Sequence, residues 1–475
     1  MHRGSRLWTR RQLVHAGGTG LFGLSLPRLL AADAARRASA RALQAPAGQR
    51  AAAKSCIFIV TSGGLSHIDT IDPRPGAPAE IRGPYAPIAT RVPGVHVTEM
   101  LPRLALLADR YTLVRSLSHG DTVHVTAAHT MLSGQPDGTP QNNSPFIGSL
   151  VARFRPSTAN VPSHVWLHNM KTGTNKVPRY ESGLNVLGHA YAPLRVGEEL
   201  DNPADQPDFR VTDFDPPGGL TTGHVTERFR LLEQLDRPLA AAEAAPDERF
   251  RGFQQKAREL VTGAAARAAF DLSGEPDDVR DRYGRHPLGQ YCIMARRLVE
   301  AGVRIVTVTA WPGLAPGETK PTVTQVWDMH DTCYGPGESM FGNGPFGMQW
   351  SLPRLDQAVS ALLADLDERG LLDETLVVLV GEFGRTPKFE SLGRGRGHWP
   401  QAYSALLAGG GVRRGAVYGE SDRQGAFVAS GRPIDHADFG ATLFHALGIP
   451  PELRWGPDGF SFRVSDGRPV EELFG

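Results

Sequence analysis

The sequence has few cysteines, no excess of either charge, and no apolar run long enough to cross a bilayer. Its 475 residues include three cysteines and no Cys-x-x-Cys pair, which excludes a disulfide-built scaffold. Lys+Arg 51 balance Asp+Glu 50 to a net charge of +1, so the charge does not favour nucleic acid or an anionic membrane as a partner. Because cysteines are so few, a bound metal ion would be held mainly by His, Asp and Glu.

The remaining composition is that of a soluble globular protein. Hydrophobic residues make up 40% and charged residues 21%, which are ordinary values. The length allows one large domain or two. Gly 54 and Pro 37 predict many long loops.

The N-terminus has the pattern of an export signal. Arg10 and Arg11 form a twin-arginine pair, an apolar stretch follows at residues 16–26, and the small residues Ala31 and Ala32 come next. This order of basic, apolar and small-residue parts predicts a twin-arginine signal peptide over residues 1–32, with a linker over 33–53. The protein is then expected in the periplasm or outside the cell. The alternative interpretation is a basic tail without structure.

Buried strands alternate with amphipathic helices along the rest of the chain. A continuous apolar run predicts a strand at residues 56–61. Further strands are predicted at 111–117, 303–309, 375–380 and 404–408. Apolar residues at helical spacing predict helices over 355–366 and 438–447. Residues 195–245 are expected to form a surface excursion and 246–300 a helical segment. The pattern predicts an α/β fold whose mostly parallel sheet is covered by helices on both faces.

Carboxylates and imidazoles follow four of these predicted strands. Ligands of open parallel sheets bind beyond the carboxyl ends of the strands, so we expect the side chains at these four ends to converge. Carboxylate with imidazole suits Zn, Mn or Fe, whereas carboxylates alone also suit Mg or Ca. The candidate metal ligands are Asp69, His124, Asp328, His330, Glu382 and His398.

Some of these residues also have a purely structural interpretation. Asp69 is followed by Thr70 and would suit a turn cap, and Glu382 would pair with Arg385 as a simple ion pair. His398 lies beside Trp399 and would suit a packed core. The cluster as a whole favours a metal site more strongly than any one member does.

Three segments resemble a sequence family called domain of unknown function 1501, within the alkaline phosphatase and sulfatase superfamily. The segments are Gly-Gly-Leu-Ser-His-Ile-Asp-Thr at 63–70, Trp-Asp-Met-His at 327–330 and Gly-Glu-Phe-Gly-Arg-Thr-Pro at 381–387. The helix predicted near the C-terminus is also similar to one of the sulfatases. The resemblance covers about residues 54–465 and implies an alkaline phosphatase-like domain there, within which the composition predicts an insertion and helical segment at about 195–300.

The sequence departs from that superfamily at the nucleophile. The resemblance implies a hydroxyl or modified Cys ten residues before Gly134, but His124 stands there. No Cys-x-Pro-x-Arg segment is present, which disfavours ordinary sulfatase chemistry. A working hydrolase would need Thr122, His124 or a metal-activated water as the attacking group, and Arg385 would clamp the anion.

These observations predict an exported hydrolase of phosphate or sulfate esters that depends on divalent metal. Its substrate would be a small-molecule or glycan ester, and the metal would be Zn, Mn, Mg or Ca. Asp69, His124 and Glu382 are expected to form one ligand group, and Asp328, His330 and His398 the other. The main alternative is a non-catalytic binding or assembly protein of the envelope. A phosphotransferase with a phosphorylated His124 is a third interpretation.

Overall fold

The computed structural model describes residues 53–135, 144–167, 187, 191–197, 203–211, 214, 221–242, 264–319, 326–456 and 462–475. The predicted signal peptide and all of the predicted linker except Ala53 lie outside these residues. Residues from Ala51 onward belong to one unit of the chain, and the description below concerns that unit alone.

An eight-stranded sheet forms the centre of this unit, in the order β12-β4-β11-β8-β1-β7-β5-β6. Strand β11 runs antiparallel to both its neighbours, and the other adjacent pairs run parallel. The predicted α/β fold with a mostly parallel sheet is thus confirmed. The strands are β1 Ser55–Val60, β4 Tyr111–Leu117, β5 His164–Leu167, β6 Leu194–Val196, β7 Ile305–Thr309, β8 Thr375–Val380, β11 Tyr403–Ala408 and β12 Ala416–Tyr418.

The central strand β1 shows why this sheet is covered on both faces. All six of its residues are buried. Ile57 and Ile59 belong to one hydrophobic core, whereas Cys56, Phe58 and Val60 belong to another. Because successive side chains of a strand point to opposite faces, a strand with no polar face needs a layer of helices on each side.

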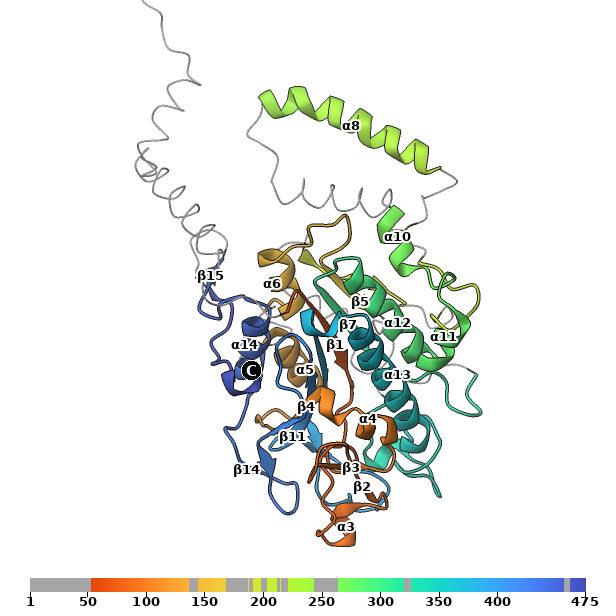
Figure 1. The fold of residues 1–475 in the computed structure, drawn as a ribbon, viewed down its shortest axis with the longest axis vertical. Helices are drawn as coiled ribbons and strands as arrows, with labels where there is room; N and C mark the ends of the chain where they lie inside the picture. The colour runs from red at the N-terminus through yellow and green to blue at the C-terminus, as the bar shows by residue number, and fades with distance from the viewer. Residues whose placement is uncertain are drawn as a thin grey trace, which may run out of the picture. The chain divides into compact units, whose positions relative to one another are not determined.

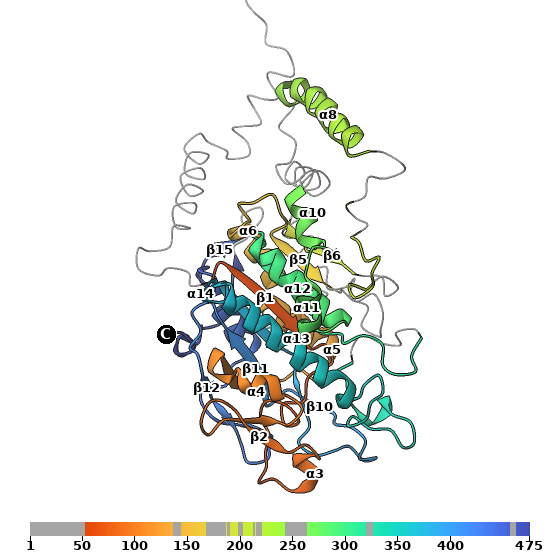
Figure 2. The same ribbon diagram turned by 45° about the vertical axis from the view of Figure 1, so that its right-hand side comes forward.

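Two groups of helices supply these layers (Figures 1 and 2). The first core is formed with α4 Pro102–Leu106, α11 Asp277–Tyr283, α12 Pro287–Glu300 and α13 Met348–Glu368. The second is formed with α5 His124–Ser133, α6 Ile147–Phe154 and α14 His436–Ala446. Helix α12 contacts β1 and β7, so the C-terminal part of the expected 195–300 insertion is a core element of the fold.

The remaining elements are short or lie away from the sheet. The remaining helices are α3 Ala79–Arg82, α8 Thr222–Ala242 and α10 Ala264–Phe270. The small strands are β2 Pro87–Ala89, β3 His96–Thr98, β9 Gly384–Arg385, β10 His398–Trp399, β13 Glu420–Ser421, β14 Val428–Ser430, β15 Arg454–Trp455 and β16 Phe462–Arg463, and the 3-10 turns are η1 Ala108–Arg110, η6 Asp331–Cys333, η7 Leu372–Glu374 and η8 Glu471–Leu473.

No helix of the described residues combines the length and the hydropathy that a membrane crossing requires.

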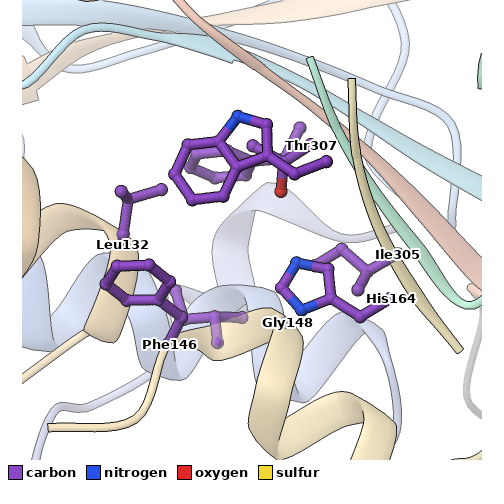
Figure 3. Close-up of a pocket in the computed structure, with 9 residues that line it drawn as sticks. Leu132, Phe146, Gly148, His164, Ile305 and Thr307 are labelled. Carbon is purple, nitrogen blue, oxygen red and sulfur yellow. The ribbon is translucent and has the colours of Figure 1, made fainter. Parts of the chain in front are cut away.

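A small pocket lies between the sheet and helices α5 and α6 (Figure 3). Apolar side chains such as Phe146 and Leu132 line it together with His164. A Cβ atom at Gly148 would lie 2.4 Å from the His164 ring, so glycine is needed for this close approach. None of the predicted site residues lines the pocket, and its apolar wall suits packing better than chemistry.

Candidate metal centre

The carboxylate of Asp328 lies among three imidazoles. Its Oδ1 atom is 3.1 Å from His124 Nε2 and 3.3 Å from His398 Nε2. Its Oδ2 atom is 3.4 Å from His330 Nε2. Four of the six predicted ligands therefore meet at one place, although 274 positions separate the first from the last in the sequence.

The sheet brings these residues together. His124 is the first residue of α5, which follows β4. Asp328 and His330 lie in the segment between β7 and α13, and His398 lies on β10, which pairs with β9 shortly after β8. Since β4, β7 and β8 run parallel, their carboxyl ends open at the same edge of the sheet.

Each imidazole is also held through its other nitrogen. His124 Nδ1 lies 2.7 Å from Glu382 Oε1, and His398 Nδ1 lies 2.8 Å from the carbonyl oxygen of Thr122. His330 Nδ1 lies 2.7 Å from the Thr332 hydroxyl. A histidine that binds metal through one nitrogen is commonly oriented in this way through the other.

These contacts determine what must lie between the rings and Asp328. Carboxylate and carbonyl oxygens only accept hydrogen bonds, so the Nδ1 atoms of His124 and His398 carry the protons. In the neutral ring each Nε2 then presents a lone pair toward Asp328 Oδ1. Lone pairs facing a carboxylate are stable only if protons or a cation supply positive charge between them.

The distances are also those expected around a bound cation. Charge-assisted N–H···O bonds are typically about 2.7–2.9 Å long, shorter than the 3.1 and 3.3 Å from His124 and His398 to Oδ1. Two ligands about 2.0–2.1 Å from one tetrahedral ion lie about 3.3–3.4 Å apart. His124 Nε2 is buried and has no partner besides Asp328 Oδ1 among the described residues. The residues present therefore fit a bound metal ion.

Glu382 lies behind His124 and is completely buried. Its Oε1 atom accepts hydrogen bonds from the backbone N–H of Gly63 at 2.8 Å and from His124 Nδ1 at 2.7 Å. Its Oε2 atom is buried and has no hydrogen-bond partner in the described part of the chain. This arrangement places Glu382 as the carboxylate that orients His124, with one oxygen still free to accept a proton donor or a cation.

The local electrostatics depend on the same pairs. Burial lowers the pKa of His124, but the neighbouring carboxylates of Asp328 and Glu382 more than offset it and raise the pKa to about 9. Asp328 chiefly, followed by Cys333, raises the pKa of His330 to about 10. Burial would raise the pKa of Asp328, yet the three imidazoles and Arg385 bring it far below its usual range. The carboxylates thus favour positive charge on the imidazoles around Asp328.

Arg385 has a different position from the substrate clamp expected from the sequence. Its side chain is fully buried, and its Nη2 donates to Asp328 Oδ1 at 2.7 Å. Its other hydrogen bonds go to backbone carbonyls, so this buried guanidinium fixes the Asp328 carboxylate and is not exposed to a substrate anion. Those carbonyls belong to Gly63, Gly64, Trp327 and Arg396.

Asp69 forms hydrogen bonds with Arg396 and Ser66 and does not join the cluster around Asp328. Its carboxylate accepts from Arg396 Nε at 2.8 Å and Nη2 at 3.1 Å, and from the Ser66 hydroxyl at 2.5 Å. Both charged side chains of this pair are completely buried. Among the described residues Asp69 belongs to neither group of possible metal ligands. The expected ligand group of Asp69, His124 and Glu382 is therefore not assembled, because His124 joins Asp328 and His398 instead.

Thr122 lies just before α5 and is exposed. Its carbonyl oxygen orients His398, so the backbone of this residue has a positioning role at the site. Its role as a nucleophile stays a prediction.

Cys333 is a neighbour of the cluster that the sequence analysis did not single out. Possible ligand atoms of Asp328, His330 and Cys333 lie within 4.8 Å of one another, as do those of His124, Asp328 and His398. The spacing Asp-x-His-x-x-Cys over 328–333 is the signal that would have indicated it, since such short separations let one turn collect all three side chains.

Comparison with solved structures finds distant neighbours. A phosphonate monoester hydrolase, SpPMH from Silicibacter pomeroyi, is 14% identical, with 88% of this chain and 76% of that chain covered and a TM-score of 0.37. The lipoteichoic acid synthase LtaP from Listeria monocytogenes is 10% identical, with 90% and 80% covered and a TM-score of 0.39. The PsFucS1 sulfatase from Pseudoalteromonas sp. is 11% identical, with 93% and 74% covered and a TM-score of 0.38. TM-scores this low carry no argument about activity.

The sequence comparisons are more decisive about family than about chemistry. No curated protein matches this sequence. Residues 53–474, however, match a sequence family described as "Protein of unknown function (DUF1501)". The family resemblance seen in the motifs is confirmed, and the chain belongs to the DUF1501 family.

Proposed function

We propose that this protein is a metal-dependent hydrolase of phosphate or sulfate esters. The observation that carries the proposal is the inward arrangement of His124, His330 and His398 around Asp328, with each Nδ1 held and each Nε2 turned toward the carboxylate. Such preorganisation is costly for a structural cluster and useful for a metal site.

His124 Nε2, His398 Nε2 and an Asp328 oxygen would hold the ion. Imidazole and carboxylate ligands suit Zn, Mn or Fe. When bound, such an ion polarises an ester oxygen and supports hydrolysis at neutral pH. Glu382 orients His124, Arg385 holds Asp328 in place, and Thr122 is the exposed hydroxyl beside the cluster.

Elemental analysis combined with an ester panel tests this proposal. We expect at least one transition-metal ion per chain in the purified protein, and turnover of at least one aryl phosphate or sulfate ester. His398→Ala should lose both, because it removes a ligand. His96→Ala is the matched control, since His96 is an exposed histidine of β3 and its replacement should change neither quantity. Wild-type protein without metal, or with equal metal in the His398→Ala variant, would refute the proposal.

Export completes the proposal. Arg10 and Arg11 with the apolar stretch after them support a twin-arginine route to the periplasm or the exterior. Replacing both arginines with lysine should leave the precursor in the cytoplasm in a fractionation experiment. Unchanged accumulation outside the cytoplasm would overturn the export proposal without affecting the metal site.

A non-catalytic role is the second candidate. The contacts and burial of the predicted catalytic side chains favour it. His124 is engaged with Glu382 and Asp328, and Arg385 is fully buried. Of the three predicted catalytic residues, only Thr122 is exposed. Metal-loaded protein that turns over no ester in a broad panel would favour this candidate.

A further inference from the structure

Cys333 lies where it can extend the ligand set of Asp328. The 3-10 turn η6 Asp331–Cys333 begins directly after His330. This turn brings the Cys333 sulfur, a His330 ring nitrogen and an Asp328 oxygen within 4.8 Å of one another. Three ligands from one six-residue segment are a compact set of the kind that holds zinc.

The two sets of ligands use different oxygens of Asp328. Oδ1 faces His124 and His398 at 3.1 and 3.3 Å, whereas Oδ2 faces His330 at 3.4 Å. A carboxylate can bind one cation through each oxygen. The set containing Cys333 therefore does not compete with His124 and His398 for the same side of Asp328.

Cys333 differs from the other two cysteines in its surroundings. Cys56 and Cys292 are buried in the hydrophobic cores, and burial raises the pKa of both thiols, that of Cys292 to about 12. Cys333 is only partly buried, and its Sγ lies 3.0 Å from the carbonyl oxygen of Asp328, to which it donates. The Cys333 thiol is therefore not enclosed in a hydrophobic core as the other two are, and a thiol beside carboxylate and imidazole is a suitable ligand.

The segment that carries Cys333 is anchored independently of any ion. The buried carboxylate of Asp331 accepts backbone N–H bonds from Leu392, Arg394 and Gly395 at 2.6–2.9 Å. Glu390 in turn accepts from the backbone N–H of Asp331 at 2.5 Å. These bonds hold the turn against the segment that leads to His398, so the ligand positions are set before metal arrives.

We propose that Cys333, His330 and Asp328 Oδ2 form a second metal position in which the Cys333 thiolate is a ligand. This inference rests on the metal centre of the proposed function and adds a sulfur ligand to it. Binding releases the thiol proton to solvent as the sulfur–metal bond forms. Thiolate and imidazole ligands favour zinc-type ions over Mg and Ca, so this position makes the centre selective for the softer ions.

Cobalt(II) titration of the full-length protein tests the assignment, because sulfur-bound cobalt gives a near-ultraviolet charge-transfer band that nitrogen and oxygen ligands do not give. Wild-type protein should show this band and bind two ions per chain. Cys333→Ser should lose the band and one ion but keep visible cobalt absorption from the remaining site. Cys292→Ala, which removes a core thiol, should keep the band.

The outcomes separate the two proposals. Cobalt binding without a sulfur band in the wild type, or a band that persists in Cys333→Ser, overturns the role of Cys333 and leaves the first metal position standing. Absence of any cobalt binding by the wild type overturns both. Addition of excess Mg²⁺ should not remove the band, and its removal by Mg²⁺ would contradict the predicted selectivity.

Discussion

Two carboxylates near the same edge of the sheet, Asp69 and Asp328, have opposite surroundings. Asp69 follows β1 and is fully buried against one guanidinium, that of Arg396. Asp328 follows β7, remains partly accessible, and faces three imidazoles besides Arg385. A guanidinium keeps its charge under all physiological conditions, whereas an imidazole can exchange a proton for a metal ion.

The comparison shows that two carboxylates at the same edge of the sheet differ in the kind of partner they have: Asp69 pairs with a guanidinium, whereas Asp328 faces imidazoles that would bind a metal ion. Asp69 has every requirement satisfied by protein groups. Near Asp328, Glu382 Oε2 is buried and lacks a hydrogen-bond partner among the described residues, and His124 Nε2 has only Asp328 Oδ1. Buried polar atoms without partners are costly, so they mark the place where a further group is expected.

The largest expected effect is the loss of folding stability when Asp69 is replaced. Asp69→Ala leaves the buried Arg396 guanidinium without its carboxylate, and breaking such a pair costs about 3–5 kcal/mol. We expect denaturant unfolding to show this loss, with metal content per folded chain unchanged. Asp373→Ala is the control, because Asp373 forms an exposed pair with Arg414 and its loss should alter stability little. If Asp69→Ala lost metal but kept its stability, Asp69 would be a metal ligand and its structural role would be wrong.

A smaller effect is expected at the carboxylate behind His124. Glu382→Gln removes the charge that orients the ring, and outer-shell changes of this kind weaken metal binding about 10–100-fold. Competition with a chelator of known affinity measures the change. Glu374→Gln provides a matched control on the surface, where Glu374 pairs with Lys54. Metal affinity unchanged by Glu382→Gln would show that the orientation of His124 does not depend on Glu382.

The smallest effect on metal is expected at Thr122. Its side chain is exposed and only its carbonyl contacts His398, so Thr122→Val should leave metal content as in the wild type. If the hydroxyl is the nucleophile, the same variant should lose turnover. Turnover equal to wild type would remove Thr122 from the candidate nucleophiles, and loss of metal would show that the change disturbs the His398 contact.

The fold was predictable where the pattern of apolar residues is long. The strands at Tyr111–Leu117 and Thr375–Val380 have the predicted bounds, because both segments are rich in β-branched and apolar residues over a length typical of strands. Strands β5 and β6 were missed, since His164–Leu167 and Leu194–Val196 are too short for periodicity to indicate them. Helix α12 lies within the segment predicted to be helical over 246–300, but its place in the core was not predicted, since the burial of Arg296 depends on its distant partners Glu275 and Asp365.

The candidate site was predictable in its location but not in its pairings. The rule that ligands gather at strand ends correctly brought His124, Asp328, His330 and His398 together. It could not assign Asp69 to Arg396, which lies 327 positions away, because ion pairs of that separation leave no trace in a single sequence. Cys333 was not among the predicted ligands, although it lies five residues after Asp328 and three after His330.

Anomalous diffraction from a crystal grown with zinc tests the central claim most directly. A difference peak recorded at the zinc edge should lie about 2.0–2.2 Å from His124 Nε2, from His398 Nε2 and from a carboxylate oxygen of Asp328. Asp69 should retain its two contacts with Arg396 in the same crystal. A zinc-saturated protein with no peak among these three residues, or with the peak at Asp69, would contradict the account.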